Sequence, residues 1–446
     1  MKRTFTLLGL TLSFFFVSGQ ENSANLRFFD DPVMKGTYFN GISSNGRYVV
    51  GENQFTNTVY LYDRKTGDMK VLTPPESEKN NLLLTGCSVS DDGTIVGRYT
   101  DQEFLIEGEP VPRAAWYKDG AWDFLEALPN TVWNGHGFDG GAEFITGAGD
   151  LIGGCLSSDR QLFFYEPTIW RDGKILKRLP LPEEPGCGGK CLAVSADGRI
   201  AGGWVRDAMY GGATIWVEDE IFILGDMGRV TNITDNGRFA IGFYQDESTL
   251  EEYRSGVPFV WTEEAGFTAL PIPEGMEGVE IYGITEDGSR IIGYSLAGFY
   301  GDRSALIYKD GVSYNFDGYL QEHYGITPEH DLFTPIDMSK DGEVMCGFTF
   351  VDGLHTPWLL EFSNYSDGID IPESYQITIS LDDRNSLLKV SGAYASLEIY
   401  NHAGVLCHRE KAGDGCTVDM REMARGVYMV KTVYNGKVKV MKVMKS

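Results

Sequence analysis

A short pattern of apolar and polar positions recurs seven times between residues 36 and 364. Each copy has an apolar residue, a Ser or Thr, a turn that ends in Gly, and a short apolar run that ends in a second Gly. Asn-Gly and Asp-Gly turns between apolar runs are strong hairpin signals, because Gly accepts positive φ at no steric cost. The pattern therefore predicts seven hairpins. They begin at Ile42, Val89, Ile145, Val194, Ile233, Ile284 and Met338.

A second hairpin follows each first one. Its first strand ends in a large residue, and a turn such as Lys-Asp-Gly or Arg-Asp-Gly leads to a final short strand. Four short strands in a unit of about 40 to 55 residues are typical of a β-propeller blade. We therefore predict an all-β fold with a seven-bladed β-propeller over residues 20–364. The large residues are Tyr62, Tyr117, Trp170, Trp216, Trp261, Tyr308 and Leu360.

The ring of blades also has to close. The seventh unit ends after the run "TPWLLEFSN" without a fourth strand, and residues 25–31 belong to no other blade. We predict that residues 25–31 pair as the outer strand of the last blade. The alternative, two separate smaller propellers, would leave exposed strand edges.

Two repeated features invite a functional interpretation that the fold explains more simply. The aromatic residues suggest a ladder for stacking ligands, but their constant place in the third strand favours packing between blades. The Asp and Asn residues of the turns resemble calcium ligands, but hydrogen bonding within the turn accounts for them. The sequence predicts no metal and no cofactor.

The first 19 residues read as a secretory signal peptide. Lys2 and Arg3 form a charged start, an apolar run follows from Thr4 to Phe16, and small residues precede a cut near Gln20. No later run reaches the roughly 18 apolar residues that span a membrane. We therefore expect an exported, soluble protein with no transmembrane helix after cleavage.

The net charge of −26 is unevenly distributed. From Ser374 onward there are 11 Lys and Arg against 7 Asp and Glu, which gives +4, whereas the preceding residues have 27 against 57, which gives −30. A strongly negative field repels phosphate backbones, so nucleic acid is excluded as an expected partner.

Seven cysteines are an odd number for an oxidising compartment. Cys187 and Cys191 lie four apart in an expected loop, and Cys407 and Cys416 flank an expected hairpin, where they would face each other across two strands. Neither pair has the spacing or the nearby His residues of a zinc site. The other three are expected to be small buried residues of repeat strands: Cys87, Cys155 and Cys346.

The repeated "VSxDGxxxG" pattern, followed by a strand that ends in Trp, is similar to the HAF-type extracellular repeats. The resemblance covers roughly Gly36 to Asn364, although the His-Ala-Phe sequence that names the family is absent. It implies a secreted β-propeller-like protein and brings no established activity.

Residues 365–374 form a polar linker, and the composition of residues 375–446 then turns basic. This last segment, with about seven expected short strands, resembles the C-terminal sorting domain of the type IX secretion system. The usual Asn-Pro opening is replaced by "ISLDDRNS". The resemblance implies a small immunoglobulin-like β-sandwich, the secretion machinery as partner, and secretion or attachment at the outer surface of a Gram-negative bacterium. An ordinary immunoglobulin-like stalk is the alternative. The matching positions are Leu397, Ile399, Tyr400, Gly404, Val418, Met420, Gly426, Val427, Tyr428 and Lys442.

The connections of the predicted propeller differ between its two faces. The turns on one face are uniformly tight, whereas the connections on the other face, here called the long-loop face, vary in length and are rich in Tyr, Phe, Trp, Arg and Asp. Variable loops on a rigid scaffold usually carry recognition. Aromatic faces with directed polar groups suit sugar rings, peptide side chains or a protein partner. The predicted binding residues are Trp133, His136, Asp139, Trp204, Arg206, Asp207, Tyr210, Tyr253, Arg254, Tyr300, Asp302 and Arg303.

The leading hypothesis is thus a secreted or cell-surface protein that binds an extracellular glycan, peptide or protein through the long-loop face. One alternative is a carbohydrate-active hydrolase or lyase, for which Asp139, Glu143, Glu280 and Asp337 lie on or just before inner strands. Glycosidic chemistry needs two convergent carboxyl groups about 5 to 9.5 Å apart. A structural or adhesive surface protein is the third alternative, and it predicts no concave pocket on that face.

Overall fold

The computed structural model divides the chain into two compact units, residues 1–365 and 366–446, each with its own hydrophobic core. None of the helices in the described part of the chain is long and apolar enough to cross a membrane. The structure describes all residues except 1–23, 54, 74–83, 107–108, 129–139, 158–164, 184–185, 207–210, 246–255, 297–302, 310, 363–377, 383–385, 402–405, 422, 435–436 and 446.

The first unit is the seven-bladed β-propeller that the sequence predicts, with four antiparallel strands in each blade. Within the first six blades, each strand pairs with the next along the chain. The first blade consists of β2 (Thr37–Ile42), β3 (Tyr48–Asn53), β4 (Thr58–Asp63) and β5 (Asp68–Leu72). The second consists of β6 (Leu84–Val89), β7 (Ile95–Ile106), β8 (Glu109–Lys118) and β9 (Ala121–Phe124). The third consists of β10 (Gly141–Ile145), β11 (Leu151–Ser157), β12 (Tyr165–Arg171) and β13 (Lys174–Arg178).

The next three blades repeat this order, and a single bridge between Gly211 and Met227 joins the fourth blade to the fifth. The fourth blade consists of β14 (Gly188–Val194), β15 (Ile200–Arg206), β16 (Gly211–Val217) and β17 (Glu220–Leu224). The fifth consists of β18 (Met227–Ile233), β19 (Ala240–Gln245), β20 (Val257–Thr262) and β21 (Gly266–Ala269). The sixth consists of β22 (Val279–Ile284), β23 (Arg290–Leu296), β24 (Arg303–Lys309) and β25 (Val312–Asn315).

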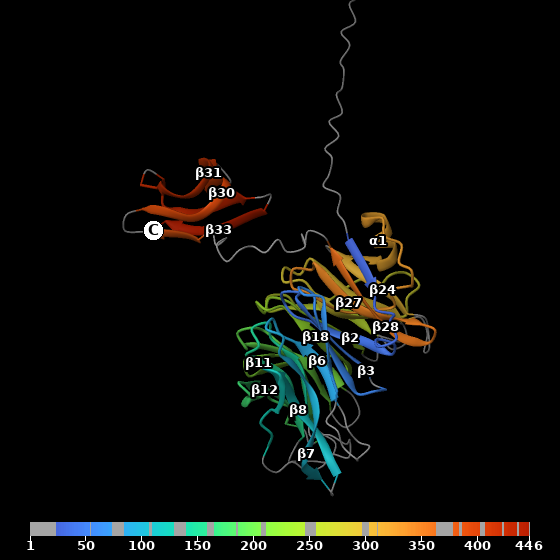
Figure 1. The fold of residues 1–446 in the computed structure, drawn as a ribbon. Coiled ribbons are helices and arrows are strands. Elements are labelled where there is room, and N and C mark those ends of the chain that lie inside the picture. Colours follow the sequence, from blue (N-terminus) through green and yellow to red (C-terminus); the bar gives the residue numbers. More distant parts are fainter. Residues whose placement is uncertain are drawn as a thin grey trace, which may run out of the picture. The chain divides into compact units, whose positions relative to one another are not determined.

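The seventh blade takes its outer strand from the start of the chain. Its first three strands are β26 (Thr334–Met338), β27 (Val344–Val351) and β28 (Leu354–Phe362), and β1 (Ala24–Phe28) pairs antiparallel with β28. In Figure 1 the blue β1 lies among the orange strands of this blade. The opposed residues Asn25 and Glu361 are 336 positions apart. This pairing covers the edge of β28 that would otherwise be open.

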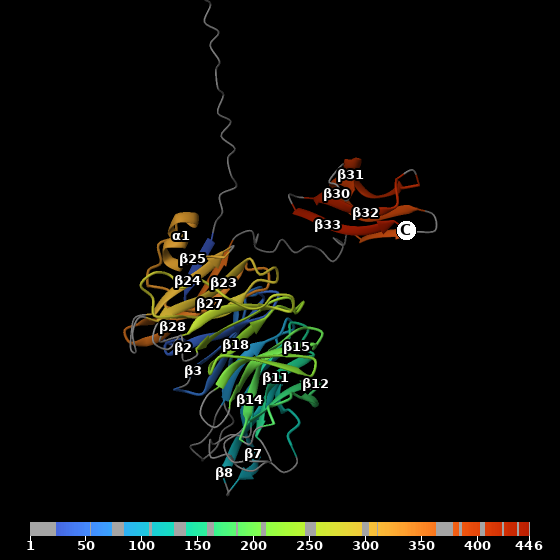
Figure 2. The same cartoon turned by 180° about the vertical axis from the view of Figure 1, so that it is seen from behind.

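The seven inner strands form a closed ring. Each contacts the inner strand of the next blade, and the last contacts the first. Figure 2 shows the unit from behind, with the inner strands β14 and β18 in view. The members of the ring are β2, β6, β10, β14, β18, β22 and β26.

The large residues of the third strands are buried, which confirms that they pack between blades. Trp170 and Trp216 are fully buried, and the indole Nε1 of each donates to a carbonyl in the connection from the preceding blade. The acceptors are Glu126 at 2.9 Å and Pro180 at 2.8 Å. The hydrogen bonds orient the rings, and the buried area supplies most of the attraction between blades.

A buried hydroxyl closes the inner hairpin of every blade. In the fourth blade, the Oγ of Ser195 accepts the Ile200 N–H at 3.0 Å and donates to Asp197 at 2.7 Å, and Asp197 also accepts the Arg199 N–H. The Asp and Asn side chains of the turns therefore act within the turn, as the sequence predicts. The seven hydroxyl residues are Ser43, Ser90, Thr146, Ser195, Thr234, Thr285 and Ser339, and each is at most 3% exposed.

The turns also bond to one another across blades. In four of the turns, the backbone N–H of the residue just after the buried hydroxyl residue donates to the carbonyl of a turn in the adjacent blade. These bonds tie the inner strands together at the tight-turn face. They join Asp91 to Gly147, Ala196 to Asp235, Glu286 to Lys340, and Lys340 to Ser44.

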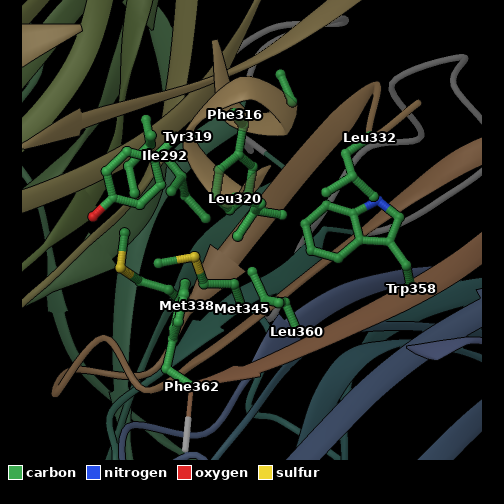
Figure 3. Close-up of a cluster of buried hydrophobic side chains, with 12 residues drawn as sticks. Ile292, Phe316, Tyr319, Leu320, Leu332, Met338, Met345, Trp358, Leu360 and Phe362 are labelled. Carbon is green, nitrogen blue, oxygen red and sulfur yellow. The ribbon is translucent and has the colours of Figure 1, made fainter. Parts of the chain in front are cut away.

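One α-helix, α1 (Phe316–Tyr324), follows the sixth blade, where the sequence analysis did not predict it. Asn315 caps its start by accepting the Gly318 N–H at 3.0 Å, and Gly325 ends it in the left-handed conformation at φ 67°. Figure 3 shows Phe316 and Leu320 pointing into a core shared with Trp358 of β28. The helix therefore covers the join between the sixth and seventh blades.

The second unit is all-β but differs in detail from the expected sandwich of about seven short strands. It has five described strands: β29 (Thr378–Asp382), β30 (Leu387–Asn401), β31 (Leu406–Asp419), β32 (Gly426–Tyr434) and β33 (Lys437–Lys445). The number of strands is smaller than expected because β30 and β31 are 15 and 14 residues long, so each takes the place of more than one short strand. β29 and β33, at the two ends of the pairing order, contact each other. The sheet therefore curls around its own core.

The cysteines depart from expectation in three places, the first of which is Cys87, which is only half-buried. Cys407 and Cys416 lie on the same strand, β31, and not on facing strands. Nine residues of strand span roughly 30 Å, so these two thiols cannot form a disulfide with each other. Cys191 lies inside β14 and not in a loop, and Cys155 and Cys346 are fully buried.

We expect Ser195→Ala to lower the free energy of unfolding by about 1–3 kcal/mol, because the buried Ile200 N–H would lose its acceptor. Ser289→Ala is the matched control, since its partly exposed hydroxyl bonds only to the exposed Asp287 of the turn. It should change stability by less than about 0.5 kcal/mol. Urea unfolding of the two variants checks this, and equal losses would contradict the role given to the buried hydroxyl.

Candidate functional site

The structure describes three of the twelve predicted binding residues. Trp204 and the exposed Arg206 lie at the end of β15, and Arg303 is the first residue of β24. All three therefore stand at strand ends that lead into the long connections. The other nine lie outside the described residues: Trp133, His136, Asp139, Asp207, Tyr210, Tyr253, Arg254, Tyr300 and Asp302.

A second set of polar side chains occupies the same end of the blades, and only two of them are expected from the sequence, as possible catalytic acids. Each inner strand begins where a connection from the preceding blade ends, and these connections belong to the long-loop face, so the first residues of the inner strands stand there. The antiparallel second strand brings its last residues to the same place. Five inner-strand members of this set are Tyr38, Glu143, Lys190, Arg229 and Glu280.

A β-bulge occurs at the same point of every inner strand and leaves one residue without a partner in the second strand. Three of these residues bond to the inner strand of the next blade: Asn40 donates to the Gly86 carbonyl, Thr231 donates to the Ile281 carbonyl, and Glu143 accepts from Lys190. In these three blades the bulge thus turns one side chain toward the next inner strand. The seven residues are Asn40, Cys87, Glu143, Leu192, Thr231, Tyr282 and Ile336.

Glu143 joins three blades. Its Oε1 accepts from the Arg98 Nη2 of the second blade at 2.5 Å and from the Lys190 Nζ of the fourth blade at 2.9 Å. The three side chains are only 16 to 17% exposed. Burial by itself would raise the pKa of Glu143, but the two adjacent cations outweigh it and lower that pKa to about 2. Glu143 is therefore a fixed anion and is poorly suited to donate a proton.

Glu280 organises a second group, the Glu280 cluster, with Tyr282, Tyr294 and Arg229. Its Oε2 accepts from the Tyr282 hydroxyl at 2.5 Å and the Tyr294 hydroxyl at 2.9 Å, and it lies 3.7 Å from the Arg229 Nη2. The two phenol rings are nearly parallel, at 14°, with centroids 5.7 Å apart. Burial raises the pKa of Tyr282 well above its ordinary value and that of Tyr294 to about 12, so both stay neutral donors.

Arg303 extends the Glu280 cluster toward the seventh blade. Its guanidinium lies 4.9 Å from the Tyr294 ring centroid, and its Nη1 donates to the Thr334 Oγ1 at 3.3 Å. Burial lowers the pKa of His355, and the positive charge of Arg303 lowers it further. His355 is therefore a neutral ring near a cation.

An aromatic patch made of Tyr38, Phe333, Phe348, Phe350 and His355 continues this surface. The His355 ring centroid lies 4.7 Å from that of Phe350, 4.9 Å from that of Phe348 and 5.4 Å from that of Tyr38. Phe350 is 45% exposed, so the patch reaches solvent. At its inner edge the Tyr38 hydroxyl donates to Glu52 at 2.5 Å.

Asp337, another possible acid, lies apart from these groups. Its Oδ2 accepts the Ile42 N–H of the first blade at 3.0 Å, and its Oδ1 accepts the Met338 N–H at 2.9 Å. Burial raises its pKa to about 6. Asp337 thus bonds across the join between the last blade and the first. Within the described part of the chain, no three His, Cys, Asp or Glu side chains are grouped as a metal site would require.

The fold and this arrangement define the chain as a seven-bladed β-propeller protein with a polar and aromatic site at one end of its ring. No protein-family model matches the chain, and none of the curated proteins matches it. Both resemblances drawn from the sequence therefore stay predictions.

Solved structures similar to the chain include β-propellers. The β-propeller domain of the Trilobed protease from Pyrococcus furiosus has a TM-score of 0.47 and 9% identity, over 73% of this chain and 96% of that one. TolB from Acinetobacter baumannii has a TM-score of 0.36 and 11% identity, over 73% of this chain and 63% of that one. Oligogalacturonate lyase from Vibrio parahaemolyticus has a TM-score of 0.42 and 11% identity, over 79% of this chain and 98% of that one. At these identities the likeness concerns the fold.

The two buried carboxyl groups predict opposite effects of pH on stability. The folded pKa of Glu143, about 2, lies below its ordinary 4.5, so its stabilising contribution is present above pH 4.5 and is lost as the pH falls toward 2. The folded pKa of Asp337, about 6, lies above its ordinary 3.8, so its contribution is present below pH 3.8 and is lost as the pH rises through 6.

We expect Glu143→Gln to lower the free energy of unfolding by about 3 kcal/mol at pH 7 and by roughly half as much at pH 3.

For Asp337→Asn, we expect the free energy of unfolding, compared with that of the unchanged protein, to rise by roughly 1.5 kcal/mol between pH 5 and pH 7.5. The reason is that the substitution removes a carboxyl group whose ionisation the folded state opposes. Denaturant unfolding at each pH measures both variants. Differences from the unchanged protein that do not vary with pH would contradict these assignments.

Proposed function

We propose that this protein is a secreted or cell-surface binding protein that takes a glycan, peptide or protein ligand over the long-loop face, at the axis of its propeller. One observation carries the proposal: charged and tyrosine side chains converge at the long-loop ends of the inner and second strands, beside a partly exposed aromatic patch. Polar groups that give direction and aromatic faces that give contact area are the usual composition of a recognition site.

The way these side chains are held supports binding. Glu143 and Glu280 are on strands, and each is fixed by at least two partners from its own or neighbouring blades. Groups fixed on strands keep their positions better than groups on loops, so a ligand has less freedom to remove when it binds. The long connections, with Trp204 and Arg206 at their base, would then add contacts that differ around the face.

We expect Arg303→Ala and Trp204→Ala each to weaken ligand binding by about tenfold or more, as removal of a central interface residue does. The mature full-length chain and both variants are screened on glycan and peptide arrays, and hits are titrated in solution. Arg238→Ala is the control, because Arg238 is exposed in a turn of the opposite face.

The results separate the hypotheses. Loss of ligand binding in the two variants, with unchanged binding by the control, would support the long-loop face as the binding site. Full binding by both variants would contradict it. Conversion of a bound glycan to products would favour the hydrolase or lyase alternative. No hit on either array would favour the structural or adhesive alternative.

We also propose that residues 375–446 direct the protein to type IX secretion or surface attachment. In support, this segment belongs to a separate compact unit with a core that includes the family-matching Leu397, Ile399 and Tyr428. The buried Lys445 near the chain's end donates to the carbonyls of Met420 and Arg421, which ties the last strand to the turn after β31.

We expect the full-length chain to reach the cell surface or medium of a Gram-negative bacterium that has the type IX system. A chain that stops at residue 365 should stay in the periplasm, because it would lack the segment that the machinery reads. Cell fractionation with immunoblotting measures this, and a strain without the secretion machinery is the control. Normal export of the shortened chain would contradict the proposal and favour the stalk alternative.

A further inference from the structure

We infer that the ligand of the propeller is an acidic oligosaccharide, with a uronic-acid carboxylate on Arg303 and a sugar ring against the aromatic patch. This inference rests on the proposed function and narrows its ligand class. Three observations carry it: the local charge at the axis, the position of two arginines around a tyrosine pair, and the aromatic surface beside Arg303.

The described side chains grouped at the axis differ in charge balance from the chain as a whole. The residues before Ser374 have 27 Lys and Arg against 57 Asp and Glu. Among the described side chains of the Glu143 and Glu280 groups, with Glu52 and Arg303, however, basic ones outnumber acidic ones by four to three. A group of side chains with an excess of cations repels a cationic ligand and attracts an anionic one. The seven groups are Arg98, Lys190, Arg229, Arg303, Glu52, Glu143 and Glu280.

The Glu280 cluster and the adjacent Arg303 together have two arginines but one carboxylate, so one positive charge is not balanced. The Tyr282 and Tyr294 rings stack, Arg229 lies 5.7 Å from the Tyr282 centroid, and Arg303 lies 4.9 Å from the Tyr294 centroid. Glu280, the carboxylate of the cluster, lies 3.7 Å from Arg229. Within the described part of the chain, Arg303 has no carboxylate within 4.0 Å and bonds only to the neutral Thr334 hydroxyl. Guanidinium groups pair with carboxylates through two parallel hydrogen bonds, so Arg303 is suited to a ligand carboxylate.

The surroundings of Arg303 favour a sugar acid over an acidic peptide. Arg303 donates to Thr334, and Thr334 lies opposite Phe348 in the pairing of β26 with β27. The Phe348 ring contacts His355, which also contacts the partly exposed Phe350. A uronic acid carries its carboxylate directly on a pyranose ring, so one residue can present the anion to a guanidinium and its apolar face to an aromatic ring. An oligomer repeats that unit, and further carboxylates can reach the cations spread around the axis, among them Arg229, whose side chain is 41% exposed.

Calorimetric titration of the mature full-length chain tests the inference. The probes are hexamers of galacturonic acid and of mannuronic acid, the same hexamers with each carboxylate reduced to a hydroxymethyl group, and a hexaglutamate peptide. We expect at least one acidic hexamer to bind, and its reduced form to bind at least about tenfold more weakly, because a charge-assisted hydrogen bond is lost. Affinity should also fall as salt rises from 0.05 to 0.5 M, since the Debye length shortens from roughly 14 to 4 Å.

Arg303→Gln is the test variant, because it keeps a polar side chain of similar length but removes the charge. We expect it to weaken binding of the acidic hexamer at least about tenfold and to leave binding of the reduced hexamer unchanged. Arg199→Gln is the matched control, since Arg199 is an exposed arginine of a tight turn. An unchanged unfolding temperature of Arg303→Gln shows that the effect is not a loss of fold.

Equal affinity for an acidic hexamer and its reduced form would overturn the inference while the proposed long-loop binding function stands. Binding of none of the sugar probes would overturn it as well, and the arrays would then decide the proposed function separately. Hexaglutamate binding as tight as that of the acidic hexamers, with the same dependence on Arg303, would also overturn it by assigning the site to acidic peptides.

Discussion

The ring depends on a hydroxyl group buried in each of its seven inner turns. The hydroxyl accepts a backbone N–H that would otherwise be unpaired in the interior, and it donates to the Asp or Asn that shapes the turn. With the turns shaped in this way, the backbones of four of them donate to a turn of the adjacent blade at the tight-turn face. The inner strands therefore leave that face at set positions, which determines where their other ends meet at the axis.

The long-loop end of the same strands has the opposite character. Charges with little exposure are costly to bury, and they are stable only where partners compensate for lost hydration. Glu143 meets this condition through Arg98 and Lys190, which come from the blades on either side. The ion pairs thus do two things: they hold three blades together and they keep charged groups in position near the axis. A ligand that draws one cation away would act on the packing of the blades as well.

Features of the fold that follow from local sequence were predictable, whereas the site depends on distant residues. The seven turns and the buried third-strand residues are encoded within a few positions of each unit, and the outer-strand role of residues 25–31 followed from counting strands. The bulges were not predictable, because a bulge is a property of two strands in register. The Glu280 cluster was missed for a similar reason, since Tyr294 and Arg303 reach it only through pairing. Cys407 and Cys416 were misplaced because a long strand was read as a hairpin.

The repeated bulge separates two kinds of information within one unit of sequence. The turn and the apolar positions specify a blade, and a change in them disturbs the neighbours. The unpaired position supplies a side chain that bonds to the next inner strand in three blades, and in this chain it holds Asn, Cys, Glu, Leu, Thr, Tyr and Ile in turn. A gene built by duplication of such a unit can diversify its recognition one copy at a time while every copy remains an acceptable blade.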